Sequence, residues 1–199
     1  LGRMGWSIPD EREKFSLHEM LAHFDIDRVS LGGPIFDVEK LRWLNGVWLR
    51  EEFSEAQLAD RLQQWAFNRD NLMSVLPHAQ KRMEVLSDFA PLAGFLVSGE
   101  LPITDADFDG LRGEREDIVR QLQFALWRLE ALRHWDRDTV WQALKALADD
   151  LGIKVKDFLA PLFIAISGSS ASFSVVDAMG LLGPDMSRMR IRHAIAILG

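Results

Sequence analysis

Most hydrophobic positions in the 199-residue chain repeat with the spacing of α-helices. In the clearest stretch, apolar residues recur at intervals of four, three, four and three, at Ile118, Leu122, Ala125, Leu129 and Leu132. Such residues share one face of a helix, because an α-helix has about 3.6 residues per turn. No segment shows the alternation of apolar and polar residues that is typical of a strand. The pattern therefore predicts an all-α protein.

Three serines mark expected helix starts, because a serine hydroxyl can accept a hydrogen bond from the first turn of a helix. Each is followed three residues later by Glu, Gln or Asp, as in a capping box. They are Ser16, Ser54 and Ser174. The helices that follow the first two should extend to about Phe24 and Phe67.

Glycine and proline mark the expected helix ends. Gly46 should end a short helix that begins at Val38. Pro77 and Pro161 each lie within a helical stretch, and each should separate one helix from the next. Pro184 should open the final helix. Residues 88–110 are rich in glycine, proline and aspartate, which predicts a boundary between two consecutive helical bundles.

Charge also differs along the chain. Residues 1–110 hold 11 Lys/Arg and 19 Asp/Glu, whereas residues 111–199 hold 12 and 11. The net charge of −7 argues against non-specific coating of a nucleic-acid backbone. A local RNA site is still compatible with this composition, because the planar guanidinium of arginine, the dominant basic residue here, suits stacking and bidentate contacts.

The residue types that enzymes use for catalysis are not arranged for it here. The chain has no cysteine, which excludes disulfides, thiolate zinc sites and a cysteine nucleophile. It also lacks the GxxxxGK[ST], GxGxxG and HExxH motifs. Asp105, Asp107 and Asp109 have odd spacing but lack the glycine and closing glutamate of a calcium loop. We therefore expect no catalytic, metal or cofactor site among these residues.

Two strings near the start, FDIDRV at 24–29 and IFDVEKLRWLNG at 35–46, carry a family signature. They resemble the FDxxRV and FDxEKLxWLNG sequences of bacterial glutamyl-tRNA synthetases, and their spacing matches too. Residues 160–168 are similar to that family's PLRxALTG segment, and residues 179–183 to its LLG helix end. LGRMGWS at 1–7 resembles the segment soon after its KMSKS-type loop. The resemblance covers the whole chain.

The resemblance implies a parent enzyme that is an ATP-dependent glutamate–tRNA ligase of class I, using ATP and magnesium. That family's Rossmann catalytic domain carries HIGH-type and KMSKS-type signatures, which are absent here. Because the chain also begins at Leu1, we expect a C-terminal fragment that is not catalytic by itself. Residues 1–50 would end the helical stem-contact region. Residues 51–108 and 109–199 would form two helical anticodon-binding subdomains.

The first candidate contact with the anticodon is Arg82. Residues 81–86 resemble the family segment in which an arginine reads the last anticodon base, and Arg82 falls on that arginine. Family members that also charge the glutamine tRNA tend to lack it, so Arg82 favours a strict glutamate enzyme. A guanidinium can donate to a base edge or stack on an unstacked base. The alternative is a helix-surface arginine paired with Glu84 or another acid.

The second candidate is the loop at 168–174. In the family, an arginine before this loop and a hydroxyl within it contact the anticodon. Here Phe163 occupies the place of the arginine, and Ser172 falls near the hydroxyl. Phe163 could stack on a base. Its apolar neighbours Leu162, Ile164 and Ile166 favour the alternative, a place in the core.

Six further arginines are candidates for contacts with tRNA phosphates, which position RNA without specifying its sequence. The alternative is that they lie on solvated helix faces. They are Arg128, Arg133, Arg137, Arg188, Arg190 and Arg192.

The expected partner is the tRNA for glutamate, bound by a cytoplasmic monomer. No membrane association is expected, because no apolar run approaches the length of a membrane-spanning helix. Two other interpretations fit the composition: a helical protein-interaction scaffold without an RNA role, and the anticodon cage of a class I lysyl-tRNA synthetase. The strings at 24–29 and 35–46 favour the glutamyl family over both.

Overall fold

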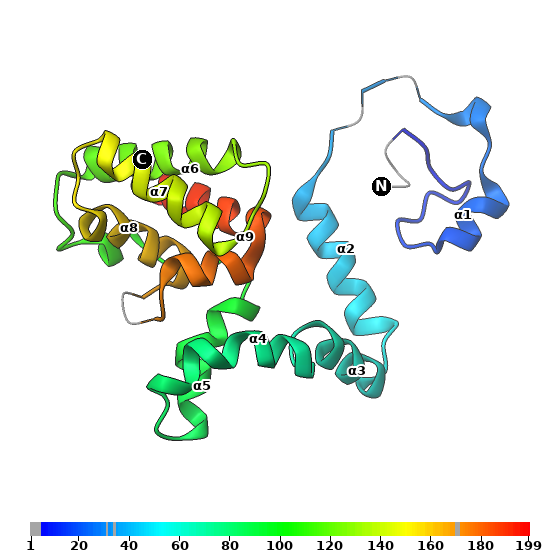
Figure 1. Cartoon of the computed structure of the whole chain (residues 1–199). Coiled ribbons are helices and arrows are strands. Elements are labelled where there is room, and N and C mark those ends of the chain that lie inside the picture. The colour runs from blue at the N-terminus through cyan, green and yellow to red at the C-terminus, as the bar shows by residue number, and fades with distance from the viewer. Residues whose placement is uncertain (1–4, 31, 34, 170–171) are drawn as a thin grey trace. The chain divides into compact units, whose positions relative to one another are not determined.

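The computed structural model describes residues 5–30, 32–33, 35–169 and 172–199, and their regular structure is helical throughout (Figure 1). The predicted all-α class is therefore confirmed. By their contacts, residues 1–65 and 66–199 form two compact units. The functional subdomains at 51–108 and 109–199 stay a prediction. None of the described helices is both long enough and apolar enough to cross a lipid bilayer.

The first unit contains α1 (Leu17–His23), α2 (Val38–Glu51) and α3 (Glu55–Trp65). The second contains α4 (Arg69–Ala79), α5 (Phe89–Ala93), α6 (Arg115–Glu130), α7 (Arg137–Asp150), α8 (Val155–Ser167) and α9 (Val175–Leu198). Short 3-10 helices lie between the α-helices along the chain: η1 (Ile26–Arg28), η2 (Gln80–Arg82), η3 (Leu86–Asp88), η4 (Gly94–Val97) and η5 (Asp105–Phe108).

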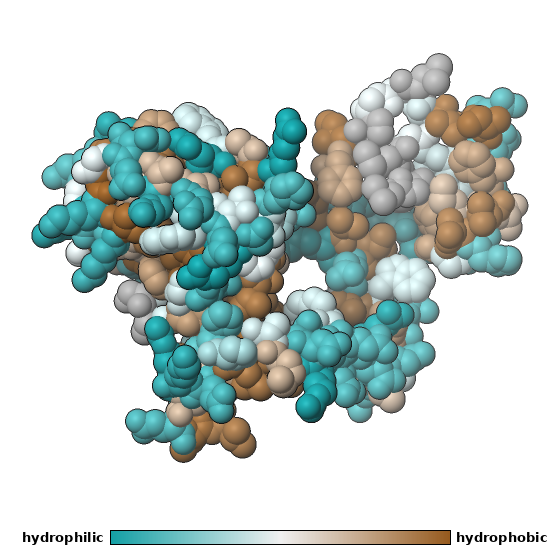
Figure 2. All heavy atoms as spheres, in the orientation of Figure 1, coloured by the Kyte–Doolittle hydropathy of each residue, from teal (hydrophilic) through white to brown (hydrophobic). Residues whose placement is uncertain are grey.

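The unit at 1–65 has little interior of its own. Its helices α1, α2 and α3 contain no buried residue. The buried hydrophobic side chains described in it are Trp6 and Ile8. The Trp6 ring packs against Phe15 and Phe24, with centroids 6.1 and 5.8 Å apart. Apolar side chains therefore stay on the surface of this unit (Figure 2), most of all Leu17, Leu21, Ile26 and Ile35.

The unit at 66–199 is built around one continuous core. Helix α9 packs against α6, α7 and α8. The apolar face predicted for α6 is buried through Ile118, Leu122, Ala125 and Leu129. The segments before α6 reach the same core through Phe95, Leu101, Ile103 and Phe108. Each large apolar side chain buried in this way contributes about 1.5–3 kcal/mol relative to an exposed one.

The capping predictions are confirmed. Ser16 and Glu19 form a complete capping box at the start of α1. Ser54 and Gln57 make the same reciprocal bonds at the start of α3, at 2.9 and 3.3 Å. The Ser174 hydroxyl accepts the amide N–H three residues later, at the start of α9. These bonds satisfy backbone donors that have no partner within the helix.

Three predicted helix breaks are wrong. Helix α2 runs through Gly46, α4 through Pro77 and α8 through Pro161. An interior glycine costs only about 1 kcal/mol relative to alanine, and helix-compatible residues follow Gly46. Pro77 lies two residues before the end of α4, so the helix gives up the hydrogen bond from position 77 to the Met73 carbonyl oxygen close to its own end. Pro161 is buried in a helix with seven buried residues, and their packing offsets a proline cost of about 3 kcal/mol.

The predicted break before Pro184 is confirmed. Gly183, with φ 78° and ψ 176°, interrupts the helical backbone of α9 at that point. This backbone conformation is open to glycine and strained for other residues.

Gly183→Ala should therefore lower the free energy of unfolding by about 1–3 kcal/mol. Gly180→Ala in the same helix is the matched control, since its added methyl would meet atoms of Arg137 at ordinary distances of 3.7–3.8 Å. That change should be neutral or stabilising by up to about 1 kcal/mol. Urea denaturation followed by circular dichroism measures both effects. Equal effects of the two substitutions would contradict the strain at Gly183.

Candidate nucleic-acid interface

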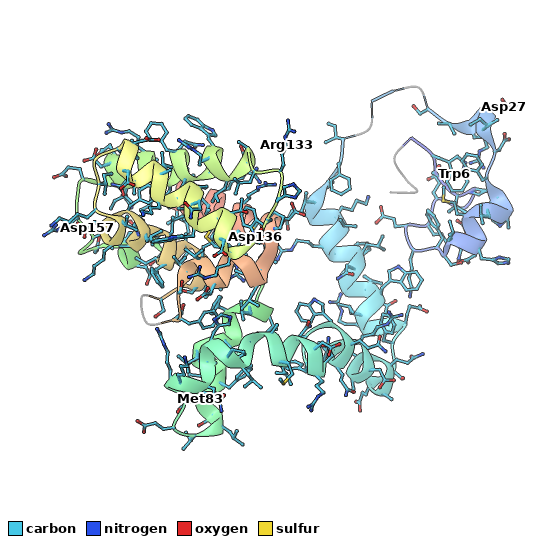
Figure 3. The ribbon with its side chains drawn as sticks, in the orientation of Figure 1. Trp6, Asp27, Met83, Arg133, Asp136 and Asp157 are labelled. Carbon is cyan, nitrogen blue, oxygen red and sulfur yellow. The ribbon has the colours of Figure 1, made fainter. Side chains whose placement is uncertain are left out.

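Two segments singled out in the sequence, 81–86 and 168–174, meet within the unit at 66–199. Arg82 is the last residue of η2, which follows α4 directly; Met83, labelled in Figure 3, comes next. Arg82 Nη1 donates a hydrogen bond to the Ser172 carbonyl oxygen at 2.5 Å. Arg82 is exposed as a residue, and this contact holds its guanidinium at one nitrogen. Residues 170–171 of the loop lie outside the described residues.

The described end of this loop is anchored by Phe173, which is 3% exposed. Its ring stacks on the ring of His78, with centroids 5.4 Å apart and planes inclined by 27°. Phe95 lies against Phe173 as well, with centroids 5.5 Å apart. His78 Nδ1 is also 3.5 Å from Asp177 Oδ2 in the first turn of α9. These contacts hold the end of α4 against the loop.

The chain beyond Arg82 forms a tight turn that ends in η3. The Asp88 carboxylate accepts the backbone N–H groups of Val85 and Glu84, at 3.0 and 2.8 Å. These two hydrogen bonds, with that from Val85 the more important, hold the pKa of Asp88 below its usual range. The turn exposes Val85 (60%) and Leu86 (89%). Cationic and apolar groups therefore lie close together at this end of the unit.

Two other candidates from the sequence have structural contacts. Ser172 is 7% exposed, and its hydroxyl donates to the carbonyl oxygen of Phe173 at 3.0 Å. Phe163 is half-buried and packs against the core. Its carbonyl oxygen accepts the Ser167 hydroxyl at 2.8 Å. The Ser172 hydroxyl thus bonds to the backbone of the loop, and the Phe163 ring lies against the core.

The surface arginines differ in their surroundings. Arg133, in the connection between α6 and α7 (Figure 3), is exposed and has no ion-pair partner within the described ranges. Arg188 donates to the carbonyl oxygen of Leu129 at 3.0 Å and lies over the Trp135 ring at 5.5 Å. The other three arginines are exposed and form ion pairs, and pairs on the surface contribute little to stability. These pairs are Arg128 with Asp150, Arg137 with Asp138 and Asp177, and Arg192 with Glu130.

Arg190 is buried, unlike the other five arginines, with 1% of its surface exposed. Desolvation lowers its pKa to about 10, which leaves it charged at neutral pH. A phosphate contact by Arg190 is not compatible with this burial. The sequence does not separate Arg190 from the neighbouring arginines, because its burial depends on the direction in which α9 faces it. Its guanidinium donates instead to the carbonyl oxygens of Phe95, Ser98, Gly99 and Ile166.

The family model for the anticodon binding domain matches residues 57–195. The chain belongs to the anticodon binding domain family. Arg82 and the described parts of the loop at 168–174 both fall inside the matched range. The contact between Arg82 and Ser172 is therefore internal to this anticodon binding domain.

Known relatives agree with this assignment. The chain is 65% identical to the "Glutamate--tRNA ligase" of Cellvibrio japonicus (strain Ueda107) and 61% identical to that of Saccharophagus degradans. Each alignment covers 100% of this chain and 40% of the relative, so the chain spans about two fifths of the relatives' length. The resemblance to glutamyl-tRNA synthetases drawn from the sequence strings is thus confirmed.

A solved structure shows the same fold. It is a glutamate tRNA ligase from Elizabethkingia meningosepticum, which matches 99% of this chain and 40% of its own with a TM-score of 0.60. The sequence identity is 19%, so this match concerns the fold alone.

Sequence reasoning missed His78 and Phe173 in this anticodon binding domain. The one local signal was that His78 lies four residues, about one helical turn, before Arg82. Phe173 has no comparable signal in the sequence. Among the described residues, no group of three or more His, Asp or Glu side chains could hold a metal ion.

Proposed function

We propose that these residues bind the anticodon loop of the tRNA for glutamate, as part of a glutamate–tRNA ligase that uses ATP to attach glutamate to that tRNA. The observation that carries the proposal is the 65% identity with a glutamate–tRNA ligase over all 199 residues. The anticodon binding family match over 57–195 supports the role of this part of the enzyme.

In this proposal, Arg82 reads the last base of the anticodon. The Ser172 carbonyl occupies one guanidinium nitrogen, at 2.5 Å, and the remaining N–H groups can donate to the edge of an unstacked base. Exposed Val85 and Leu86 offer apolar surface to the same base. The domain's specificity would thus depend on a few local groups, since the net charge of −7 does not favour a general attraction for RNA.

Phosphate contacts would orient the tRNA without reading its sequence. We assign them to five arginines, and first to Arg133, because it is exposed and has no ion-pair partner among the described residues. The other four arginines are Arg128, Arg137, Arg188 and Arg192.

Ser172 and Phe163 would shape the loop at 168–174.

Binding at the anticodon would help to place the distant acceptor end of the tRNA in the active site. Remote binding energy of this kind can raise turnover as well as affinity. We assign ATP and magnesium to parts of the enzyme outside these residues, because the sequence carries no phosphate-binding motif. We also infer a cytoplasmic monomer, with functional subdomains at 51–108 and 109–199.

The test is aminoacylation by the full-length enzyme carrying Arg82→Ala, with the glutamate tRNA and with the same tRNA altered at its last anticodon base. Loss of a base-reading arginine typically costs ~1–3 kcal/mol and relaxes specificity at the base that it reads. We therefore expect kcat/KM for the glutamate tRNA to fall by about 10- to 100-fold. The value for the altered tRNA should change little.

Arg69→Ala is the matched control, because Arg69 is an exposed arginine on the adjoining helix α4. It removes the same charge and should affect both tRNAs equally and slightly. An equal loss with both tRNAs in Arg82→Ala would mean a phosphate contact, and no loss would remove Arg82 from the interface. Either result would overturn its role as a reader.

A further inference from the structure

The acceptor of the Arg82 hydrogen bond, the Ser172 carbonyl oxygen, lies next to the buried residue Phe173. The Ser172 carbonyl belongs to the peptide group that ends at the nitrogen of Phe173. Because a peptide group is planar, the position of Phe173 restricts where that carbonyl oxygen can lie. Phe173 is 3% exposed, and its ring contacts the rings of both His78 and Phe95.

His78 connects this anchor to Arg82 from the other side. It lies one helical turn before Arg82, in the last turn of α4, and η2 follows without an intervening loop. Its ring stacks on Phe173, while its Nδ1 lies 3.5 Å from Asp177 Oδ2. Asp177 Oδ1 in turn accepts a hydrogen bond from Arg137 Nε at 2.8 Å. One side chain thus links the segment that carries Arg82 to the segment that carries its acceptor.

We propose that His78 and Phe173 are positioning residues, whose ring stack holds the Ser172 carbonyl against Arg82 and so orients the guanidinium before the tRNA arrives. This inference rests on the proposed function of Arg82. An arginine side chain that is already ordered loses less rotamer freedom when it binds. The stack would therefore improve both affinity for the glutamate tRNA and discrimination of its last anticodon base, without any contact between His78 and RNA.

The test uses the full-length enzyme with His78→Ala and His78→Phe, each with and without Arg82→Ala. Ordering one side chain at an interface is worth about 0.5–1.5 kcal/mol, which corresponds to about 2- to 10-fold in binding. His78→Ala should raise the KM for the glutamate tRNA and lower base discrimination by that factor, while the KM values for glutamate and ATP stay unchanged. His78→Phe keeps an aromatic ring on Phe173 and should stay within about twofold of wild type.

The Arg82→Ala background separates positioning from a direct contribution. If His78 acts through Arg82, adding His78→Ala to Arg82→Ala should produce no further loss of discrimination. If His78→Ala reduces discrimination in the Arg82→Ala background as much as it does in the wild-type enzyme, the proposal is overturned. An unchanged discrimination in His78→Ala alone, when Arg82→Ala itself reduces it, would overturn it as well. If Arg82→Ala has no effect on discrimination, the proposed function fails first, and this inference fails with it.

A second measurement needs no tRNA. Hydrogen exchange at the amides of residues 172–174 should be faster in His78→Ala than in wild type and close to wild type in His78→Phe. Unchanged exchange in His78→Ala would mean that the stack does not order the loop, which would overturn the proposal whatever the kinetics. Faster exchange together with the predicted loss of discrimination supports it.

Discussion

Residues 66–199, produced without residues 1–65, should unfold in one cooperative transition, whereas residues 1–65 alone should show none. Of the 31 buried hydrophobic residues described in the chain, Trp6 and Ile8 are the two in the first unit. Helices α1 to α3 bury no residue, and isolated helices of 7, 14 and 11 residues are marginal in water. The second unit has the continuous core around α9. Its free energy of unfolding should fall in the usual range of about 5–15 kcal/mol.

Far-UV circular dichroism during thermal and urea denaturation measures both parts. The control is the whole chain, whose main transition should coincide with that of residues 66–199. A steep, cooperative transition in residues 1–65 alone would contradict the prediction. It would mean that the small cluster of Trp6, Phe15 and Phe24 stabilises that unit by itself.

Arg190→Met should destabilise residues 66–199 by about 3–5 kcal/mol, because it leaves several carbonyl oxygens without their donor. The guanidinium joins two places in the fold: the turn at 95–99 and the last turn of α8, through the Ile166 carbonyl oxygen. Methionine fills a similar volume but cannot donate, so the buried carbonyl oxygens lose a hydrogen bond. Each such loss costs roughly 1–3 kcal/mol, and relief from burying the charge offsets part of the sum.

Arg192→Met is the matched control, two residues away on the same helix. Arg192 is exposed and paired with Glu130, and an exposed pair contributes about 0–1 kcal/mol. Urea midpoints of the two variants give the comparison. An Arg190→Met variant within about 1 kcal/mol of wild type would show that the four carbonyl contacts contribute little to stability.

Arg190→Lys separates charge from geometry. Lysine keeps the positive charge, but its ammonium group cannot reproduce the fork that reaches carbonyl oxygens of both segments. We expect Arg190→Lys to lie closer to Arg190→Met than to wild type. This order of stability would identify the hydrogen-bond geometry, rather than charge, as the contribution of Arg190.

The sequence by itself determined the helical class, the capped starts of α1, α3 and α9, and the apolar face of α6. These features are local: a cap is decided within three residues, and a helix face by a repeat of three and four. The family resemblance was also readable, because the strings at 24–29 and 35–46 are contiguous in the chain.

Only the tertiary structure decided which helices continue and which arginines face solvent. Pro161 stays inside α8 because packing offsets its local cost, and a local pattern does not contain that packing. Arg190 and Arg192 look alike in the sequence, yet α9 turns one toward buried carbonyl oxygens and the other toward Glu130. The pairing of Arg82 with Ser172, and of His78 with Phe173, joins segments far apart in the chain. Such contacts form only when the core brings the two segments together, so a local sequence pattern does not reveal them.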